Sequence, residues 1–508
     1  MALDKNVKVL VIGAGAMGAG IAHVAALAGH PVYLYDTRAE AIDKGLGGIA
    51  KDLDFLVSKG KLDSAAREAT MARLTAVTDL DAASDAGLAI EAIVENLDIK
   101  QKLFLQLESL LGDEAILASN TSSLSITAMA AVLARPERLA GLHFFNPAPR
   151  MKLVEIVSGL ATDRAVANTL YATAKAWGKV AVHAKSTPGF IVNRVARPFY
   201  AEALRVLNEC AAEPATIDAA MRECCGFPMG PFELMDLIGH DVNYAVTRSV
   251  FDAYFGDKRF TPSLIQYDLV LAGRLGRKSG RGFYAYGADV AKPAARTEAP
   301  ATAERSVTAV GSLGVAEPLL ARLEAAGVAV TRKAGPADAA GWLEIGRGRL
   351  TLSDGRTAAR RTAEEGLSNL VLLDLCLDYA TTPRVVLSRA DHCGLGAWHA
   401  VVGTLQQAGL TVSRIDDVAG LIGLRTVAML ANEGADAVLQ GIGSAADIDL
   451  AMRFGTNYPK GPLSWADQIG VRFVARVLHN LREHYGEERY RVSPLILRKS
   501  HNGDSFHE

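Results

Sequence analysis

The first 185 residues alternate short apolar runs with stretches of helical periodicity. A β-prone run over 7–12 is followed by a glycine-rich turn and a helix of small residues over 17–27. A second apolar run over 31–35 ends at Asp36, which completes a strand–helix–strand unit. The alternation then continues, with strands predicted over 88–94 and 115–118 and a helix over 97–111. This pattern predicts a parallel sheet with helices on both faces.

After Pro188 the apolar positions follow a helical period instead. A long helix is predicted over 190–210 and a shorter one over 216–225, and more helix follows. A stretch rich in Ala and Pro without apolar periodicity then indicates a linker. The predicted parts are an α/β domain (1–185), a helical domain (186–286), a linker (287–305), a small α/β domain of unknown role (306–415), a second helical domain (416–485) and a loose polar tail (486–508).

The two helical regions share one sequence pattern. Residues 189–239 align with 420–470 without a gap, and 16 of the 51 positions are identical. The matches include Gly-Pro and Ile-Gly pairs at equivalent places in both stretches. The second stretch carries Leu424 where the first carries Asn193. The pattern indicates a duplicated helical domain whose second copy has lost a polar side chain.

Composition excludes several classes of protein. The 508 residues carry 54 basic and 56 acidic side chains, so no basic excess points to a nucleic-acid partner. No apolar stretch reaches the roughly 18 residues of a membrane span, and the N-terminus does not resemble a signal peptide. Five cysteines are too few for a disulfide framework and lack zinc spacing. We therefore expect a cytoplasmic protein without a membrane or metal site.

The glycine-rich turn is typical of dinucleotide binding. Gly13, Gly15 and Gly18 form a GxGxxG pattern between a predicted strand and a predicted helix. Such glycines permit the tight turn, leave room for a pyrophosphate and let helix and strand pack closely. Asp36, at the end of the next strand, suits the 2′-hydroxyl of a ribose. The acidic residue favours NAD over NADP, although Arg38 lies close by in the sequence.

A candidate catalytic pair lies in two neighbouring apolar runs. His143 stands in one and Glu155 in the next, and the proline-rich turn between them would let the two runs pair. A carboxylate on one imidazole nitrogen fixes the tautomer and raises the basicity of the other. Each residue on its own could equally be structural. Beside a dinucleotide site, together they predict a general base and its partner.

These motifs together resemble the NAD-dependent L-3-hydroxyacyl-CoA dehydrogenase family. The resemblance covers 7–286 and includes Ser-Asn-Thr-Ser-Ser-Leu from Ser119, His-Phe-Phe-Asn-Pro from His143 and Thr-Pro-Gly-Phe-Ile-Val-Asn-Arg from Thr187. It implies a Rossmann-type domain followed by an all-α domain that dimerises. The C-terminal half resembles a long bacterial subgroup, which implies 3-hydroxyadipyl-CoA or 3-hydroxybutyryl-CoA as substrate in phenylacetate or fatty-acid catabolism.

The resemblance also implies roles for individual residues. His143 would be the general base and Glu155 its partner, while Ser122, Asn146 and Asn193 would bind the substrate. Lys59 would contact CoA, although the sequence around it matches poorly. Arg150 could meet a distal carboxylate or simply face solvent. The residues implied at NAD are Gly13, Gly15, Ala16, Met17, Gly18, Asp36, Glu95, Lys100, Ser122 and Lys278.

Other readings of the sequence stay open. The same frame could oxidise a free 3-hydroxy acid, or a non-catalytic protein could bind the dinucleotide. A second enzyme within 306–415 is a further alternative, but that stretch carries no catalytic motif. The duplicated helical domain could pack on the first copy as an internal partner. The chain would then be a monomer with pseudo-dimeric helical domains, and a homo-oligomer is the alternative.

Overall fold

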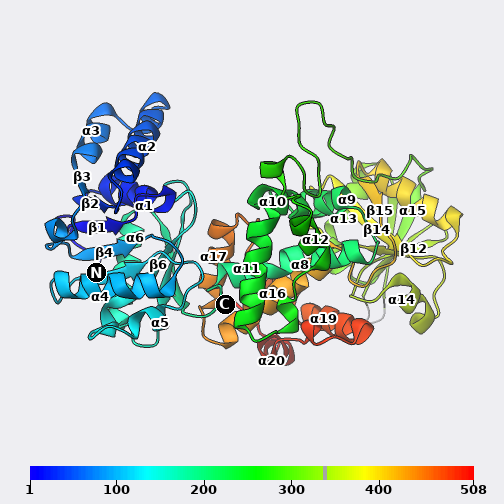
Figure 1. Cartoon of the computed structure of the whole chain (residues 1–508). Helices are drawn as coiled ribbons and strands as arrows, with labels where there is room; N and C mark the ends of the chain where they lie inside the picture. The colour runs from blue at the N-terminus through cyan, green and yellow to red at the C-terminus, as the bar shows by residue number, and fades with distance from the viewer. Residues whose placement is uncertain (336–339, 508) are drawn as a thin grey trace. The chain divides into compact units, whose positions relative to one another are not determined.

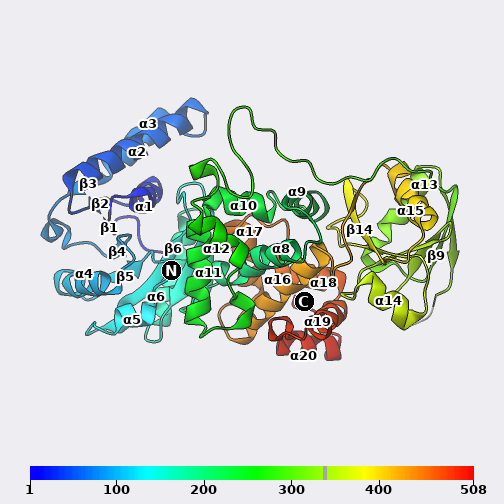
Figure 2. The ribbon, with the colours of Figure 1, turned by 45° about the vertical axis from the view of Figure 1, so that its right-hand side comes forward.

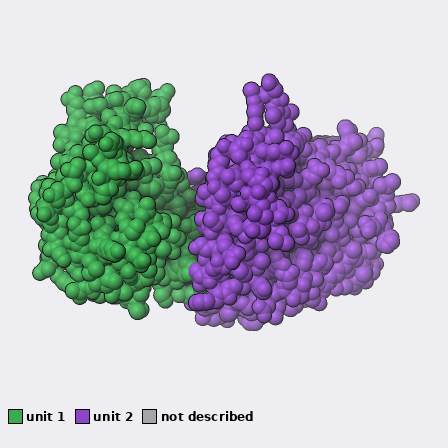
Figure 3. Space-filling model, viewed as in Figure 1, with its two compact units in different colours: residues 1–194, 440–456 green, residues 195–439, 457–508 purple. Residues whose placement is uncertain are grey.

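The computed structural model describes residues 1–335 and 340–507, which form two compact units (Figure 3). Unit 1 contains residues 1–194 and 440–456, and unit 2 contains 195–439 and 457–508. Residues 336–339 of the predicted small α/β domain and residue 508 of the predicted tail lie outside the description. Each unit contains a β-sheet of its own.

Unit 1 is built on an eight-stranded sheet with the strand order β3-β2-β1-β4-β5-β6-β7-β8. All neighbouring strands run parallel except β6 and β7, which are antiparallel. The strands are β1 (Val9–Ile12), β2 (Val32–Tyr35), β3 (Leu74–Val77), β4 (Leu88–Glu91), β5 (Ile116–Ser119), β6 (Leu139–Phe144), β7 (Leu153–Ser158) and β8 (Val180–Lys185). The parallel sheet predicted from the first 185 residues is thereby confirmed.

Helices cover both faces of this sheet. The helix α4 packs against α5, and both lie across the strands from α1 and α2 (Figure 1, Figure 2). The main core consists of Val, Ile, Leu and Ala side chains from the strands and from α1, α2 and α6. The helices are α1 (Ala16–Leu27), α2 (Ala39–Ser58), α3 (Ser64–Ala72), α4 (Leu97–Leu110), α5 (Ile126–Ala130), α6 (Arg164–Ala176), α7 (Val192–Val195) and α17 (Ala445–Gly455), with short 3₁₀ turns η1 (Leu80–Ala83) and η2 (Pro136–Arg138).

Unit 2 contains a seven-stranded mixed sheet with the order β10-β9-β11-β12-β13-β14-β15. Its strand β11 runs antiparallel to both neighbours, unlike the central strands of unit 1. The strands are β9 (Ser306–Val310), β10 (Ala329–Lys333), β11 (Trp342–Ile345), β12 (Gly348–Leu352), β13 (Leu370–Leu373), β14 (Arg384–Arg389) and β15 (Thr411–Arg414). The helices α13 (Pro318–Ala325), α14 (Ala358–Glu365) and α15 (Leu395–Gln407) accompany this sheet (Figure 2).

The remaining helices of unit 2 come from both sequence copies. The helix α16 of the second copy packs against α8 of the first. These helices are α8 (Arg197–Asn208), α9 (Pro214–Ala219), the π-helix η3 (Ala220–Cys224), α10 (Pro231–Ile238), α11 (His240–Ala253), α12 (Leu264–Leu271), α16 (Gly423–Leu439), α18 (Pro462–Ile469), α19 (Val471–Tyr485) and α20 (Pro494–Asn502), with 3₁₀ turns η4 (Lys258–Phe260), η5 (Arg277–Ser279), η6 (Gly314–Ala316) and η7 (Glu488–Tyr490).

Two local expectations are wrong. The single helix predicted over 190–210 is divided at Ala196, because Pro198 near the start of α8 has no N–H to continue the preceding helical turn. The tail after residue 486 is not loose, because it forms η7 and α20. Leu495 and Ile496 of α20 are buried, and α20 packs against α19. Apolar residues at helical spacing therefore anchor a stretch whose overall composition is polar.

The predicted linker contains no helix or strand between 291 and 304, as its composition suggested. Its backbone nevertheless forms hydrogen bonds to other parts of unit 2. The Arg296 N–H donates to Thr216 Oγ1 at 3.0 Å, and the Glu298 N–H donates to the Val412 carbonyl at 2.8 Å. The linker therefore follows a defined course along unit 2.

The two sequence copies contribute to the sheets in a reciprocal manner. In unit 1, α17 of the second copy packs on β7 and β8, and the Lys185 N–H donates to the Ile442 carbonyl at 2.8 Å. In unit 2, η3 of the first copy packs on β14, and the Asp416 N–H donates to the Ala211 carbonyl at 3.0 Å. Donor and acceptor in the second bond are each related to those in the first by 231 residues, the spacing of the repeat. Each sheet is thus completed by the helical copy that is distant from it in the sequence.

Candidate active site

The turn between β1 and α1 has the form of a phosphate cradle. Gly13 adopts φ +102°, and a Cβ on Gly18 would overlap the Gly13 carbonyl oxygen, so both positions need glycine. A Cβ on Gly15 would meet nothing within 4 Å, which leaves the N-terminus of α1 open. No acidic residue occupies the first turn of α1, and Gly15 supplies no side-chain cap. The free N–H groups there suit a pyrophosphate, as NAD requires.

Asp36 lies at the end of β2, beside this cradle. One carboxylate oxygen accepts the Ala14 N–H at 2.9 Å and the other accepts the Arg38 N–H at 3.1 Å. The Arg38 side chain, which is 77% exposed, approaches the same carboxylate at 3.8 Å. Asp36 therefore helps to shape the glycine turn. Its position after β2 suits contact with a ribose hydroxyl.

The structure brings the two predicted catalytic side chains together. His143 and Glu155 are directly opposite each other in the antiparallel β6–β7 pair. His143 Nδ1 lies 2.7 Å from Glu155 Oε2, and both residues are buried. Glu155 Oε1 accepts the N–H groups of Ile191 and Val192 at 3.0 and 3.1 Å. One carboxylate thus holds the imidazole and also anchors the start of α7, which carries Asn193.

A cavity of about 330 Å³ opens in front of this pair. The aromatic rings of Phe145 and Phe190 lie 4.5 and 5.7 Å from the His143 ring and limit its rotation. The predicted residues Ser122, Asn146 and Asn193 all line the cavity with His143, as do Met17, Glu95 and Lys100. Every one of these side chains comes from unit 1. The cavity therefore combines a carboxylate-bound imidazole with hydroxyl and amide groups.

Lys100 is one of the most deeply buried polar side chains, with 1% of its surface exposed. Its ammonium donates to both carboxylate oxygens of Glu91, at 2.9 and 3.1 Å, and lies 2.9 Å from Glu95. Burial alone would raise the pKa of Glu95. The Lys100 ammonium and the N–H of Ser122 outweigh burial and hold this pKa below its usual range. Lys100 therefore keeps Glu95 ionised and oriented at the cavity.

Sequence reasoning missed Glu91 and Asn120. Glu91 ends β4 fully buried, where it accepts the Ser119 hydroxyl at 2.6 Å as well as Lys100. Asn120 Oδ1 accepts the Phe144 N–H at 2.8 Å and so fixes the backbone beside His143. A carboxylate inside an apolar strand, with a lysine nine residues later, was the available signal for Glu91.

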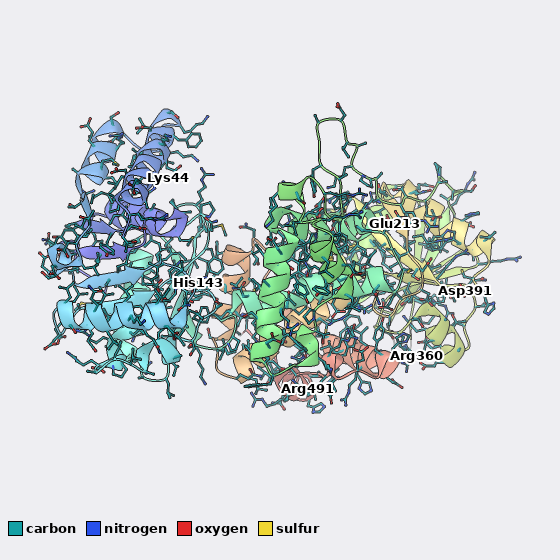
Figure 4. The ribbon with its side chains drawn as sticks, viewed as in Figure 1. Lys44, His143, Glu213, Arg360, Asp391 and Arg491 are labelled. Atoms are coloured by element: carbon teal, nitrogen blue, oxygen red, sulfur yellow. The ribbon has the colours of Figure 1, made fainter. Side chains whose placement is uncertain are left out.

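A second cavity of about 620 Å³ lies between α1 and α2. It is lined by Gly15 and Asn146 together with the basic residues Arg38, Lys44 and Lys51 (Figure 4 labels Lys44 on α2). The predicted CoA contact Lys59 caps the far end of α2, where its ammonium lies 5.6 Å from the centre of the Phe55 ring. The basic side chains of this cavity suit phosphate groups.

Lys278 and Arg150, like Lys59, line neither of these cavities. Lys278 belongs to unit 2, where its ammonium is 2.7 Å from Asp241 Oδ2. Arg150 follows the turn after Pro147 and is 72% exposed, with Asp52 at 4.0 Å. Their proposed contacts with cofactor and substrate stay predictions.

The second sheet contains positions that correspond to His143 and Glu155 of the first. Asp374 follows β13 at the position that corresponds to His143, and Val386 of β14 corresponds to Glu155. The Asp374 carboxylate accepts the N–H groups of Ile422 and Gly423 at 3.0 and 2.7 Å. Ile422 and Gly423 are the repeat counterparts of Ile191 and Val192. A carboxylate thus still binds the N–H groups at the start of the helix in the second copy. This carboxylate belongs to Asp374, which occupies the position of His143, so no imidazole is present there.

The chain matches family profiles over most of its length. The NAD-binding domain of 3-hydroxyacyl-CoA dehydrogenase matches residues 8–187. The C-terminal domain of that enzyme matches 189–286 and again 420–505, which agrees with the duplication. A reduced Rossmann-fold domain of 3-hydroxybutyryl-CoA dehydrogenase matches 350–418.

Individual relatives agree with these matches. The 3-hydroxyadipyl-CoA dehydrogenase of Escherichia coli K12 is 46% identical over 97% of both chains. A probable 3-hydroxybutyryl-CoA dehydrogenase of Deinococcus radiodurans is 45% identical over 54% of this chain and 99% of its own. The crystal structure of 3-hydroxybutyryl-CoA dehydrogenase from E. coli K12 superposes with a TM-score of 0.88, at 44% identity over 98% of this chain and 99% of its own. The chain belongs to the 3-hydroxyacyl-CoA dehydrogenase family.

Proposed function

We propose that this family member oxidises the C3 hydroxyl of an L-3-hydroxyacyl-CoA, with His143 as the general base. The observation that carries the assignment is the buried 2.7 Å contact between His143 Nδ1 and Glu155. With Nδ1 held as the donor, Nε2 is left as the basic nitrogen that can accept the substrate's hydroxyl proton. Glu155 stabilises the positive charge that the imidazole then acquires.

The other cavity residues orient the reactants. NAD, when bound, supplies the acceptor for the hydride that leaves C3. The open N-terminus of α1 and Asp36 would hold it, with Glu95 and Lys100 near the reacting end. Ser122 and Asn193 would hydrogen-bond the substrate oxygens and place the hydroxyl proton within reach of His143. In the reverse direction, protonated His143 would donate its proton to the ketone oxygen.

Asp36 offers a test of the cofactor assignment. In Asp36→Asn, the side chain can still accept the Ala14 N–H but no longer repels a 2′-phosphate. We expect the ratio of kcat/KM for NADP to that for NAD to rise roughly tenfold, which corresponds to about 1.4 kcal/mol. Initial rates with both cofactors measure this ratio. The exposed Asp43→Asn on α2 is the control, and an unchanged ratio in Asp36→Asn would argue against the ribose contact.

We also propose 3-hydroxyadipyl-CoA as the preferred substrate. Support comes from the E. coli relative of that name, which is matched over 97% of its length, whereas shorter relatives match only about half of this chain. The basic cavity beside α2 suits the phosphates of CoA. The CoA portion would supply binding energy remote from C3, so that a free acid should react poorly.

NADH formation with a substrate panel tests this proposal. We expect kcat/KM for 3-hydroxyadipyl-CoA to exceed that for 3-hydroxybutyryl-CoA at least about tenfold, on the scale of one added polar contact. The 3-hydroxyhexanoyl-CoA control matches the adipyl chain in length but lacks its carboxylate. Equal rates with hexanoyl and adipyl substrates would overturn the adipyl preference. A free 3-hydroxy acid that reacts as fast as its thioester would overturn the CoA assignment.

We infer that the active chain is a monomer with an internal pseudo-dimer. In unit 2, α16 of the second copy covers α8 of the first, where a simpler family member would need a second chain.

Among residues 1–335 and 340–507, no helix is both long and apolar enough to cross a membrane. All five cysteines are free thiols, and Cys224 and Cys376 lie unlinked near one another, which supports a reducing compartment such as the cytoplasm.

A further inference from the structure

Unit 2 contains a cavity of about 270 Å³ whose charged lining is entirely basic. It lies beside α8, η4 and the start of α12. Four arginines line it, and none of the described side chains that line it is acidic. The remaining wall is largely apolar. We call this the arginine cavity, and its four basic residues are Arg197, Arg205, Arg259 and Arg489.

Two of these arginines are neutralised by neighbouring carboxylates. The Arg259 guanidinium lies 3.0 Å from Glu433 and 2.6 Å from Asp436, and all three side chains are buried. Arg205 forms an ion pair with the buried Glu202. Their charges are therefore largely compensated within the protein. Arg489 also forms an ion pair, with Glu487, so Arg197 is the one lining arginine for which the described residues supply no ion pair.

Arg197 is buried, and no carboxylate among residues 1–335 and 340–507 is recorded as its ion-pair partner. Only 6% of the residue is exposed, and its Nε has no hydrogen-bond partner. One terminal nitrogen donates to Thr247 Oγ1 at 3.1 Å, and the guanidinium lies 4.9 Å from the centre of the Tyr200 ring. Burial lowers the pKa of Arg197, and the groups that counter this effect are Tyr200 and Tyr458. An uncompensated buried charge is costly, which indicates that an anion completes the site.

Arg489 lines the same cavity and is only partly satisfied in its hydrogen bonds. It pairs with Glu487, but its buried Nε has no hydrogen-bond partner. Burial lowers the pKa of Arg489, and the positive charge of Arg205 lowers it further. The guanidinium groups of Arg205 and Arg489, which both line the arginine cavity, are therefore close enough to repel each other. An anion placed there would relieve that repulsion.

The duplicated copy provides an internal comparison. Arg259 in η4 and Arg489 in η7 are counterparts within the repeated Gly-x-x-Arg-aromatic stretch. Around Arg259 the second copy supplies Asp436, whereas the corresponding residue of the first copy is Arg205. Ala428 of the second copy corresponds to Arg197. Both arginines line the same cavity, but the repeat places Asp436 beside Arg259 where it places Arg205 on the side of Arg489.

We propose that the arginine cavity binds a carboxylate attached to an aliphatic chain, held through Arg197 and Arg489. Planar guanidinium groups match a carboxylate geometrically, and both arginines line the cavity with hydrogen-bonding capacity that the described residues leave unused. The apolar side chains of Leu204, Phe260 and Leu264 also line the cavity. They favour a methylene chain over a fully hydrated inorganic ion. The proposal concerns unit 2 alone and does not depend on the catalytic role of His143.

Calorimetric titration of the full chain with adipate tests the proposal, because adipate carries both chemical features. We expect the wild-type chain to bind adipate and Arg197→Met to bind it at least about tenfold more weakly, as loss of a charged hydrogen bond implies. Inorganic phosphate, which has no chain, should bind more weakly than adipate. The control Arg248→Met removes an exposed arginine that pairs with Asp252, and it should leave adipate binding unchanged.

Thermal unfolding separates this role from a structural one. Without adipate, Arg197→Met should unfold at the same temperature as the wild type or above it, because it removes an unpaired buried charge. Adipate should raise the melting temperature of the wild type but not of the variant. If Arg197→Met does not fold, Arg489→Gln serves as the second variant, with the same expected loss of binding. The proposal is overturned if adipate does not bind, if phosphate binds as tightly, or if the folded variant retains full affinity. None of these readouts requires enzymatic activity.

Discussion

His143→Gln is expected to lower kcat for 3-hydroxyacyl-CoA oxidation by about 10²–10⁴-fold, the range that general acid–base catalysis contributes. Glutamine can still hydrogen-bond Glu155 across the β6–β7 pair but cannot accept the hydroxyl proton. The cradle at Gly13 and Gly18 and the Asp36 carboxylate lie outside the substitution. The dissociation constant of NAD should therefore change little.

Steady-state kinetics together with fluorescence titration of NADH check this result. The matched control is His183→Gln on the neighbouring strand β8, where the imidazole stacks on Tyr171 at 4.6 Å, away from the catalytic pair. The control should keep most of the wild-type kcat. A turnover of His143→Gln close to that of the wild type would disprove the general-base assignment. A parallel loss of NADH binding would instead indicate damage to the fold of unit 1.

Arg425→Met should cause a large loss of stability in unit 2. Arg425 of α16 is 1% exposed and lies 2.7 Å from the buried Glu202 of α8. It also bonds Glu209, Tyr485 and Tyr490, at 3.0, 3.0 and 2.7 Å. Removing one partner leaves Glu202 short of a counter-charge in the interior. Breaking a buried pair in this way typically costs about 3–5 kcal/mol.

Urea denaturation, monitored by circular dichroism, measures this loss as a shift of the unfolding transition of unit 2. The exposed pair of Arg248 and Asp252 provides the control, because Arg248→Met should cost less than about 1 kcal/mol. Light scattering on the same samples tests the internal pseudo-dimer. A mass of one chain supports it, and a stable dimer would contradict it. If Arg425→Met is insoluble, Tyr490→Phe removes two hydrogen bonds of the same network, one from Arg425 and one to Glu202, at a cost of about 1 kcal/mol each. A wild-type transition in Arg425→Met would show that the network contributes little.

The sequence predicted unit 1 well because its signals are local. The strand–glycine turn–helix unit is contiguous, and the separation of His143 from Glu155 is short enough for one turn to join their strands. The antiparallel strands of unit 2 were harder to predict, because β11 and β12 alternate polar and apolar residues over few positions. The polar composition of the last 20 or so residues concealed α20, whose buried Leu495 and Ile496 are its anchoring side chains.

Contacts over long sequence separations account for the rest. The spacing of nine residues between Glu91 and Lys100 hinted at a pair, but the burial of Lys100 depends on how α4 packs against the sheet. Likewise, the repeat indicated two helical copies but not their reciprocal assignment. That assignment depends on β7 and β8 meeting a helix that begins at Ala445. Such pairings are set by tertiary packing rather than by local propensity.

The reciprocal arrangement also constrains how the protein is made. In unit 1, the helix α17 packs on β7 and β8. The strands of this sheet lie within residues 1–194 and therefore leave the ribosome long before α17, which lies within 440–456. At about 5–20 residues per second, that interval lasts roughly 10 to 50 seconds. During that time the buried faces of β7 and β8 that α17 covers are exposed in the nascent chain. Holding chaperones would then be needed most by the catalytic half, although that half is synthesised first.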